Sequence, residues 1–208
     1  MTDFTLVIGS KRFSTWSLRP WLVLRQAEIA FHEIVIPLRQ DDTKARILEH
    51  SPSGKVPLLK HGDRLIWDSL AIVEYLAEQV PSLWPRDPAA RAMARSVSAE
   101  MHSGFQPLRQ ALPMALDVET LPTPALSDDV QADIARIIAL WAACRDRFGQ
   151  DGPFLFGAWS IADAMYAPVA TRLTTYQIPV DAATAAYLTA VYALPAMQDW
   201  IKAAQQEG

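Results

Sequence analysis

Strand signals are confined to the first eighty residues of this 208-residue chain, and this asymmetry constrains its fold more than any other feature. Over residues 1–80, short apolar runs alternate with stretches whose apolar positions recur at helical spacing. Three prolines then fall within eight residues, at Pro81, Pro85 and Pro88, and make a stiff linker. The sequence therefore predicts two domains, an α/β domain over 1–80 and an all-helical domain over 89–208, joined by a linker at 81–88.

The expected elements of the first domain alternate between strand and helix. Short apolar runs predict strands at 4–8, 32–36, 56–59 and 65–67. Amphipathic stretches predict helices at 15–27, at 41–49 and from residue 69 onward. A compact turn, His61-Gly62-Asp63, joins the last two strands. The order β-α-β-α-β-β-α is that of a thioredoxin-like domain, with one parallel crossover and a terminal antiparallel hairpin.

The second domain is expected to be a bundle of helices. Apolar positions recur at helical spacing over 89–112, 128–148, 160–175, 182–188 and 195–205. The clearest of these stretches, 128–148, carries Trp141 and Cys144 on its apolar face. We therefore expect the single cysteine of the chain to be a buried, inert thiol rather than a nucleophile.

Composition and charge exclude several classes of function. The formal net charge is −4, and no basic run suggests a nucleic acid or an anionic membrane as partner. No apolar stretch reaches a membrane-spanning length, and the first residues lack the pattern of a signal peptide. One cysteine and four scattered histidines exclude an internal disulfide and a Cys/His metal cluster. We expect a soluble, cytoplasmic, metal-free globular protein.

The segment Ser14-Thr15-Trp16-Ser17 lies between the first expected strand and the first expected helix. A hydroxyl group there faces the positive end of the helix, where free N–H groups and the macrodipole favour an anion. The structural alternative is that Ser14 simply caps the helix. The two roles are compatible, because a capping hydroxyl can still donate its own proton to a ligand.

Two further segments could present backbone and charge to a ligand. In Gly54-Lys55-Val56-Pro57, a cis proline bond would turn the N–H and C=O of Val56 outward to pair with an extended peptide, whereas a trans proline would mark an edge strand. In Asp68-Ser69, the serine and the start of the following helix suit a carboxylate, and Asp68 suits an ammonium group. A simple helix cap is the alternative reading of this pair.

Ser160 and Asp163 stand three residues apart at the start of an expected helix. This spacing is that of a capping box, in which each side chain satisfies a backbone donor at the helix start. We expect a structural role for both residues.

Taken together, in this order and at these distances, these segments resemble one family, the soluble glutathione transferases. The resemblance covers nearly the whole chain and rests on the Ser14 segment, the Val56–Pro57 pair, the run Asp68-Ser69-Leu70-Ala71-Ile72, the proline-bearing linker and the Ser160–Asp163 box. The zeta class looks closest. Its Ser-Ser-Cys-Ser-x-Arg motif is similar to the segment from Ser14 to Arg19, and its Gln-Pro-Leu-Gln segment is similar to Gln106-Pro107-Leu108-Arg109.

The resemblance implies a glutathione transferase that uses glutathione as co-substrate. Ser14 would donate a hydrogen bond to the glutathione sulfur and stabilise its thiolate, with Ser17 as the competing serine. Val56, beside a cis Pro57, would pair with the cysteinyl backbone of the tripeptide. The remaining contacts would come from Lys55, Asp68, Ser69, Gln106 and Gln110, with Ser69 at the γ-glutamyl carboxylate and Asp68 nearby.

Departures from the zeta pattern bear on the second substrate. Trp16 stands where the zeta class has its cysteine, which excludes a thiol-assisted mechanism through that residue. The class grips a dicarboxylate with arginines at positions that are Phe13 and Thr175 here, while Arg12 and Arg172 are shifted from them. This argues against maleylacetoacetate isomerase activity.

We expect instead a pocket for a hydrophobic electrophile, flanked by Phe13, Trp16 and a group on the helical domain: Met101, His102 and Phe105. The resemblance further implies a detoxification enzyme and a homodimer. Two alternatives stay open: a non-catalytic binding module with a transferase fold, and a glutathione-dependent isomerase of the zeta type.

Overall fold

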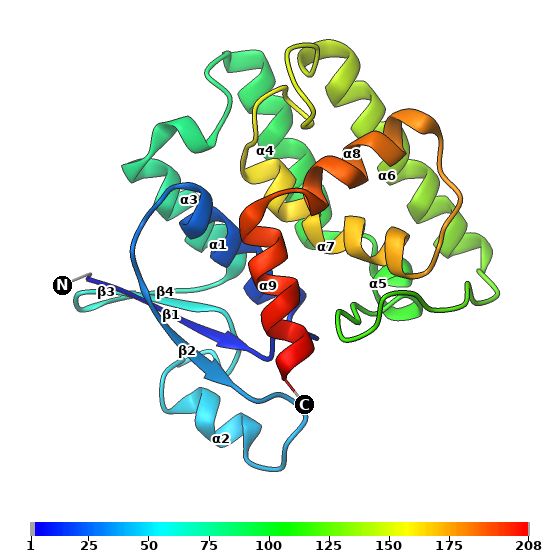
Figure 1. Cartoon of the computed structure of the whole chain (residues 1–208). Coiled ribbons are helices and arrows are strands. Elements are labelled where there is room, and N and C mark those ends of the chain that lie inside the picture. The colour runs from blue at the N-terminus through cyan, green and yellow to red at the C-terminus, as the bar shows by residue number, and fades with distance from the viewer. Residues whose placement is uncertain (1–2, 208) are drawn as a thin grey trace.

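The computed structural model describes residues 3–207. Its strands form one mixed sheet in the order β2-β1-β3-β4 (Figure 1). The strands are β1 (Phe4–Gly9), β2 (His32–Ile36), β3 (Leu58–His61) and β4 (Arg64–Ile66). The central strand β1 pairs in parallel with β2 and antiparallel with β3, so that it is flanked on both edges. Helices cover both faces of this sheet, which explains why Leu6, Val7 and Ile8 are all apolar and buried rather than alternating with polar residues.

Three helices cover the two faces of the sheet: α1 (Thr15–Gln26) and α3 (Ser69–Gln79) on one face and α2 (Thr43–Leu48) on the other (Figure 1). Successive residues of β1 supply both sides. Leu6 belongs to the core under α1 and α3, while Val7 packs with Ile47 of α2. The α/β fold expected for the first part of the chain is therefore confirmed.

All elements after β4 and α3 are helical in the part of the chain that the structure describes. They are the short 3-10 helix η1 (Pro81–Leu83), α4 (Pro88–Ser103), α5 (Gln106–Ala111), α6 (Asp128–Phe148), α7 (Ile161–Thr175), α8 (Ala182–Tyr192) and α9 (Pro195–Gln206). None of the described helices is both long enough and apolar enough to cross a bilayer.

The single helix expected over 89–112 is broken into α4 and α5. Gly104 ends α4, and Phe105 adopts a left-handed conformation with φ of 57°. Pro107 then opens α5, where its missing N–H is not needed. The break matters because it turns α5 toward the sheet and carries Gln106, Arg109 and Gln110 to the mouth of a cavity.

The two parts of the molecule share one apolar core. The central helix α7 is buried on nearly every side and packs against both α1 and α4. Ser160 and Asp163 form the predicted capping box at its start, with the Asp163 carboxylate accepting from the Ser160 N–H at 2.8 Å. Helix α9 then returns across α1 and ends near the end of β1 (Figure 1).

Candidate functional site

A cavity of about 750 Å³ opens where the start of α1 faces α5 and α7. Ser14, Trp16 and Val56 line its sheet side, and Gln106 and Arg172 line its helical side. A second hollow of about 470 Å³ adjoins it and leads to the start of α3. Because Trp16, Lys55 and Val56 line both, the two hollows form one continuous binding surface across the end of the sheet.

Ser14 is the serine that lines the larger cavity. It stands at the N-cap position of α1, yet its side chain caps no backbone N–H. Its hydroxyl instead donates to Oγ of Ser17 at 2.7 Å, and Ser17 accepts a second bond from the Gly9 N–H at 3.1 Å. Ser17 is fully buried, so its role is to join α1 to β1, while Ser14 keeps an edge toward the cavity.

The carboxylate of Asp68 organises the far end of the second hollow. One oxygen caps α3 by accepting from the N–H groups of Leu70 and Ala71, at 3.0 and 3.3 Å. The other oxygen lies 2.7 Å from Nε2 of His102 on α4. Asp68 is therefore the cap of this helix, as the cap reading of the Asp68-Ser69 pair expected, while Ser69 is its first residue.

The hydroxyl of Ser69 has a different environment. It is buried at the wall of the second hollow and has no hydrogen-bond partner among the described residues. A buried hydroxyl without a partner costs free energy, so its position at a hollow points to a ligand that completes its bonding.

The loop before β3 has the form that the resemblance implies. The peptide bond between Val56 and Pro57 is cis, which settles the two alternatives left open for that proline. Gly54 adopts a φ of 63°, a conformation that favours glycine, and its carbonyl accepts from Nζ of Lys44 at 3.2 Å. The exposed Lys55 and the half-buried Val56 then line both hollows.

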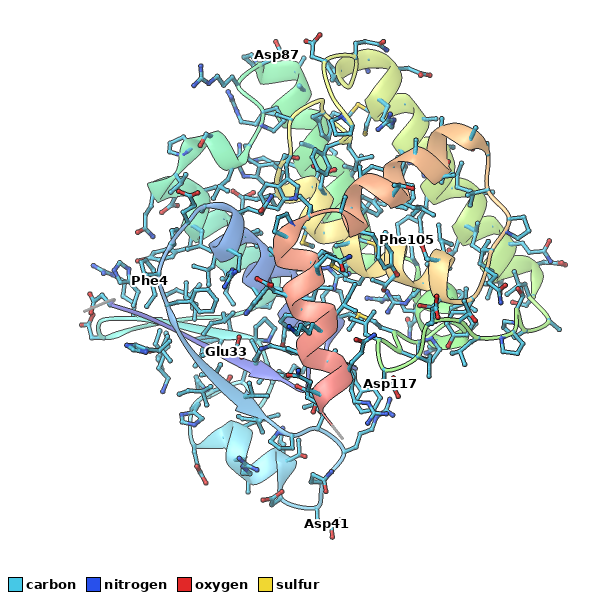
Figure 2. The ribbon with its side chains drawn as sticks, in the orientation of Figure 1. Phe4, Glu33, Asp41, Asp87, Phe105 and Asp117 are labelled. Atoms are coloured by element: carbon cyan, nitrogen blue, oxygen red, sulfur yellow. The ribbon has the colours of Figure 1, made fainter. Side chains whose placement is uncertain are left out.

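The expected apolar substrate pocket is only partly present. Phe13 and Trp16 do line the larger cavity. Phe105 does not, because its side chain is buried under the helices (Figure 2 labels its place), and Met101 is buried as well. His102 lies in the second hollow, paired with Asp68 and packed edge-on against Trp16 with ring centroids 5.2 Å apart.

Three arginines that the sequence did not predict for the site line the larger cavity: Arg39, Arg109 and Arg172. Arg172 lines it from α7, Arg109 from α5, and Arg19 stacks beneath Trp16 with its guanidinium 4.1 Å from the ring centroid. Arg19 and Arg172 are almost fully buried, and neither makes an ion pair among the described residues. Backbone carbonyls hold them instead, including those of Met165 and Leu112.

Burial and mutual repulsion lower the pKa values of the two buried arginines. Burial and then the positive charge of Arg109 lower the pKa of Arg172 to about 10. Burial and then Arg172 and Arg109 hold the pKa of Arg19 well below its usual range. An anion in the cavity would relieve this repulsion. The signal that could have found the cluster was an arginine inside the apolar stretch of α7.

The single cysteine lies outside both hollows of this site. Burial raises the pKa of the Cys144 thiol to about 12, which fits the expected inert role. Within residues 3–207, no three His, Cys, Asp or Glu side chains gather in a way that could hold a metal ion.

Comparison with known proteins identifies the family. The family model described as the glutathione S-transferase N-terminal domain matches residues 13–79, and that of the glutathione S-transferase C-terminal domain matches residues 124–203. The two matches together cover more than half of the chain. The chain belongs to the glutathione S-transferase family.

Individual relatives within this family match over shorter segments. A probable maleylacetoacetate isomerase from Caenorhabditis elegans is 36% identical over 96 residues, which cover 45% of this chain and 44% of that protein. A maleylacetoacetate isomerase from Rattus norvegicus is 46% identical over 61 residues, or 28% of each chain. These matches span less than half of the length of either relative.

The fold of this glutathione S-transferase family member recurs in solved structures. A glutathione transferase homologue from Burkholderia GL BGR1, crystallised with bound glutathione, superposes with a TM-score of 0.73. The two chains are 24% identical, and the match covers 99% of each. The likeness extends to both the sheet and the helical part.

Proposed function

We propose that this protein is a glutathione transferase that activates the glutathione thiol as a thiolate for attack on an electrophile. The observation that carries the proposal is the continuous surface from Ser14 to Ser69, with the Ser14 hydroxyl at one end and the buried, unpartnered Ser69 hydroxyl at the other. An extended tripeptide with a thiol in its middle and a carboxylate and an ammonium group at one end suits this surface.

The residues of the second hollow would hold the γ-glutamyl end. The unpartnered Ser69 hydroxyl donates to the carboxylate, and the half-exposed Asp68 carboxylate, which also pairs with His102, faces the ammonium group. Val56 pairs its backbone with the cysteinyl residue, since Val56 precedes β3 and lies outside the ladder between β1 and β3. Lys55, Gln106 and Gln110 border the same surface and supply further polar contacts.

Ser14 would act on the sulfur. A free thiol has a pKa near ~8.5, and a donor at a helix N-terminus favours the thiolate, since both interact with the charged form. The thiol proton leaves to solvent, the sulfur lone pair forms a bond to the electrophilic carbon, and the leaving group takes the electron pair of the bond that breaks. Ser14 supplies a hydrogen bond and forms no covalent bond itself.

The electrophile is best described as one that carries a negative charge. The cavity expected to take a purely hydrophobic molecule is bordered by Arg109 and Arg172, with Arg19 behind Trp16. Among residues 3–207, no acidic side chain forms an ion pair with these cations, although the charge of Asp133 acts on Arg109. A carboxylate on the substrate would supply the missing negative charge.

The same arginines support a second candidate function, the glutathione-dependent isomerase of the zeta type. The argument that its shifted position takes Arg172 away from the substrate is wrong, because Arg172 lines the cavity beside Ser14. The argument holds for Arg12, which pairs with Asp117 outside the cavity. Both relatives described above bear the name maleylacetoacetate isomerase, one of them as probable, which favours this candidate further.

We also propose a homodimer in the cytoplasm with a role in detoxification. The support is the family, together with the frequency of two-fold dimers among proteins that associate with themselves. Sedimentation at micromolar concentration tests the assembly: a species of twice 23.1 kDa is expected, and one of 23.1 kDa contradicts it.

Retention on immobilised glutathione tests the proposed function. The purified protein should bind the resin and leave it on addition of free glutathione, and it should then conjugate glutathione to chlorodinitrobenzene with release of chloride. Retention without conjugation and without isomerisation of maleylacetoacetate would favour the non-catalytic binding module. Loss of retention would contradict all three readings of the site.

A further inference from the structure

The loop that leads to Ser14 is tied to the far end of the chain. The carboxylate of Glu207, which follows α9, accepts from two consecutive backbone N–H groups: from Lys11 at 2.7 Å and from Arg12 at 3.1 Å. Trp200 of α9 donates its indole N–H to the Lys11 carbonyl at 3.0 Å. Three backbone groups of one turn are thus bonded to a helix almost two hundred residues away in the sequence.

These bonds satisfy two backbone N–H groups of the loop that find no acceptor within the turn itself. The Ser10 carbonyl accepts from the N–H groups of Phe13 and Ser14, at 3.2 and 2.9 Å, and closes the turn. The N–H groups of Lys11 and Arg12 point outward from that turn and find their acceptor in Glu207. Two adjacent amides around one carboxylate form a charge-assisted pair, which is stronger than two neutral hydrogen bonds.

The position of Ser14 depends on this turn. Its own N–H is held by Ser10, so a turn released from Glu207 would carry the Ser14 hydroxyl with it. A catalytic donor must meet the reacting atom within a narrow distance, and a displacement of about 1 Å can cost about a hundredfold in rate.

We propose that Glu207 is a positioning residue of the active site, which holds the turn before Ser14 in the geometry needed for thiolate stabilisation. This inference rests on the proposed function. Glu207 acts through the backbone of Lys11 and Arg12 and does not itself touch the sulfur. Asp117 lies near the C-terminal end of α9 (Figure 2) and pairs with the side chain of Arg12. The Arg12 guanidinium also donates to the backbone carbonyl of Glu207 at 3.3 Å, so a side chain of the turn is bonded here as well.

The direction of the rate change on replacement of Glu207 distinguishes positioning from a direct effect of its negative charge. Glu207 is an anion bonded to the turn that leads to Ser14, so if its charge alone mattered, its removal would favour the thiolate and speed the reaction. Positioning predicts the opposite, because the freed turn moves the donor away. Glu207→Gln removes the charge and keeps one acceptor oxygen, whereas Glu207→Ala removes both acceptors.

Asp199→Ala is the matched control. Asp199 is also an acid on α9, and it bonds to Arg25 of α1 at 2.7 Å, so this change removes the same charge and one contact between α9 and α1. It leaves the turn before Ser14 untouched. Unfolding midpoints of all variants show whether each is folded, and the near-isosteric Gln variant keeps the test available if the Ala variant unfolds.

The experiment measures kcat, KM for glutathione and the thiolate absorbance titration with chlorodinitrobenzene as electrophile. Glu207→Ala should lower kcat about tenfold and raise the thiolate pKa, with KM changed less than about twofold, since Asp68 and Ser69 hold the other end of glutathione. Glu207→Gln should fall between Ala and the parent. In a Ser14→Ala background, Glu207→Ala should have no further effect on kcat.

Other outcomes overturn the proposal. They are a rate that rises in both Glu207 variants, a rate equal to that of Asp199→Ala, or an undiminished effect in the Ser14→Ala background. If the parent shows no glutathione-dependent turnover, the proposed function fails. Amide hydrogen exchange then still tests whether Glu207 holds the turn before Ser14. Faster exchange at residues 11–14 in Glu207→Ala but not in Asp199→Ala supports it, and equal exchange in the two overturns it.

Discussion

Ser14 and Ser17 lie one helical turn apart and have opposite environments, although their chemistry is the same. Ser17 accepts from the Gly9 N–H and from Ser14, and it is closed off from the cavity. Ser14 donates to Ser17 in the free protein and borders the cavity. A ligand sulfur can therefore replace Ser17 as the acceptor of the Ser14 proton without breaking the link between α1 and β1.

Ser14→Ala should accordingly raise the pKa of bound glutathione and slow thiol addition at neutral pH by about tenfold to a thousandfold, the effect of removing one donor from a charge-stabilising site. Binding should change much less. A thiolate absorbance titration of Ser14→Ala and Ser17→Ala with bound glutathione checks this. A parent-like titration in Ser14→Ala would refute the assignment, and a shift only in Ser17→Ala would move the role to that serine.

Ser69→Ala should weaken glutathione binding by about 1.5–3 kcal/mol, because the ligand carboxylate loses a charge-assisted donor. Stability should stay near that of the parent, since Asp68 caps α3 and the Ser69 hydroxyl has no partner among the described residues. Calorimetric titration measures the affinity. Ser98→Ala is the control, because Ser98 is also buried with an unpartnered hydroxyl but lies within α4 away from the hollow. Equal affinity in both variants would leave Ser69 without a role in binding.

At the same scale, the residue types of the site were predictable and the charges around it were not. The serines, the Val56–Pro57 pair and Asp68-Ser69 stand at helix starts and before a strand, where local sequence determines the geometry. Arg172 and Arg109 reach the cavity only because α5 and α7 pack beside α1. No local pattern carries that information, and Phe105 was misplaced for the same reason.

At the scale of elements, helix starts were more predictable than helix breaks. Asp68, Asp87, Ser127 and Asp181 each accept from a backbone N–H at the start of a helix, as their side chains favour. The break between α4 and α5 depends instead on Phe105 in a left-handed conformation, which phenylalanine seldom adopts. The ring of Phe105 is buried, and its packing is a tertiary feature that the sequence pattern does not contain. The pattern therefore predicted one continuous helix over 89–112.

The capping box of α7 should make stability depend on pH. Burial raises the pKa of Asp163 from 3.8 to about 6, against the opposing effect of its hydrogen bonds to Leu155 and Ser160. Between these values the folded chain keeps a proton that the unfolded chain releases. This contribution is therefore fully present below pH 3.8 and is lost as pH rises through about 6, at a cost of about 3 kcal/mol.

Urea unfolding of the parent and of Asp163→Asn at several values from about pH 4 to about pH 7 checks this linkage. The parent should lose stability relative to the variant as pH rises. Asp181→Asn is a control of opposite sign, because hydrogen bonds from Thr184 lower the pKa of the Asp181 carboxyl at the start of α8. Its contribution is present above its unfolded pKa and lost as pH falls. Parallel curves for the parent and Asp163→Asn would rule out the linkage.

At the scale of the whole molecule, the division into an α/β part and a helical part followed from the distribution of strand signals. The contacts that join the two parts did not. Helix α7 packs on α1, and α9 returns to bond the turn before Ser14, over separations that no periodicity reveals. The site therefore depends on both parts: the sheet side presents hydroxyl and backbone groups, and the helical side presents positive charge.

That distribution of charge predicts a preference among electrophiles. Chlorodinitrobenzoate carries a ring carboxylate that chlorodinitrobenzene lacks, while both lose chloride on attack by a thiolate. Arg109 is the better arginine to change, since it is half-buried at the cavity wall, whereas the buried Arg172 also holds the carbonyls of Leu112 and Pro168. Arg109→Gln should lower kcat/KM for the carboxylated substrate about tenfold, the loss of one charge-assisted contact, and leave the neutral substrate nearly unchanged.

Arg136→Gln removes the same charge from the exposed face of α6, where Arg136 pairs with Glu100, and should alter neither rate. Added salt distinguishes a bound anion from a distant field, because a contact inside the cavity is screened much less than an interaction across the surface. The selectivity of the parent should therefore persist as ionic strength rises. If Arg109→Gln lowers the rates with both substrates equally, the arginine shapes the cavity rather than selecting charge. If neither rate changes, the cationic side of the cavity binds no substrate carboxylate, and the hydrophobic electrophile expected from the sequence becomes the better description of the substrate.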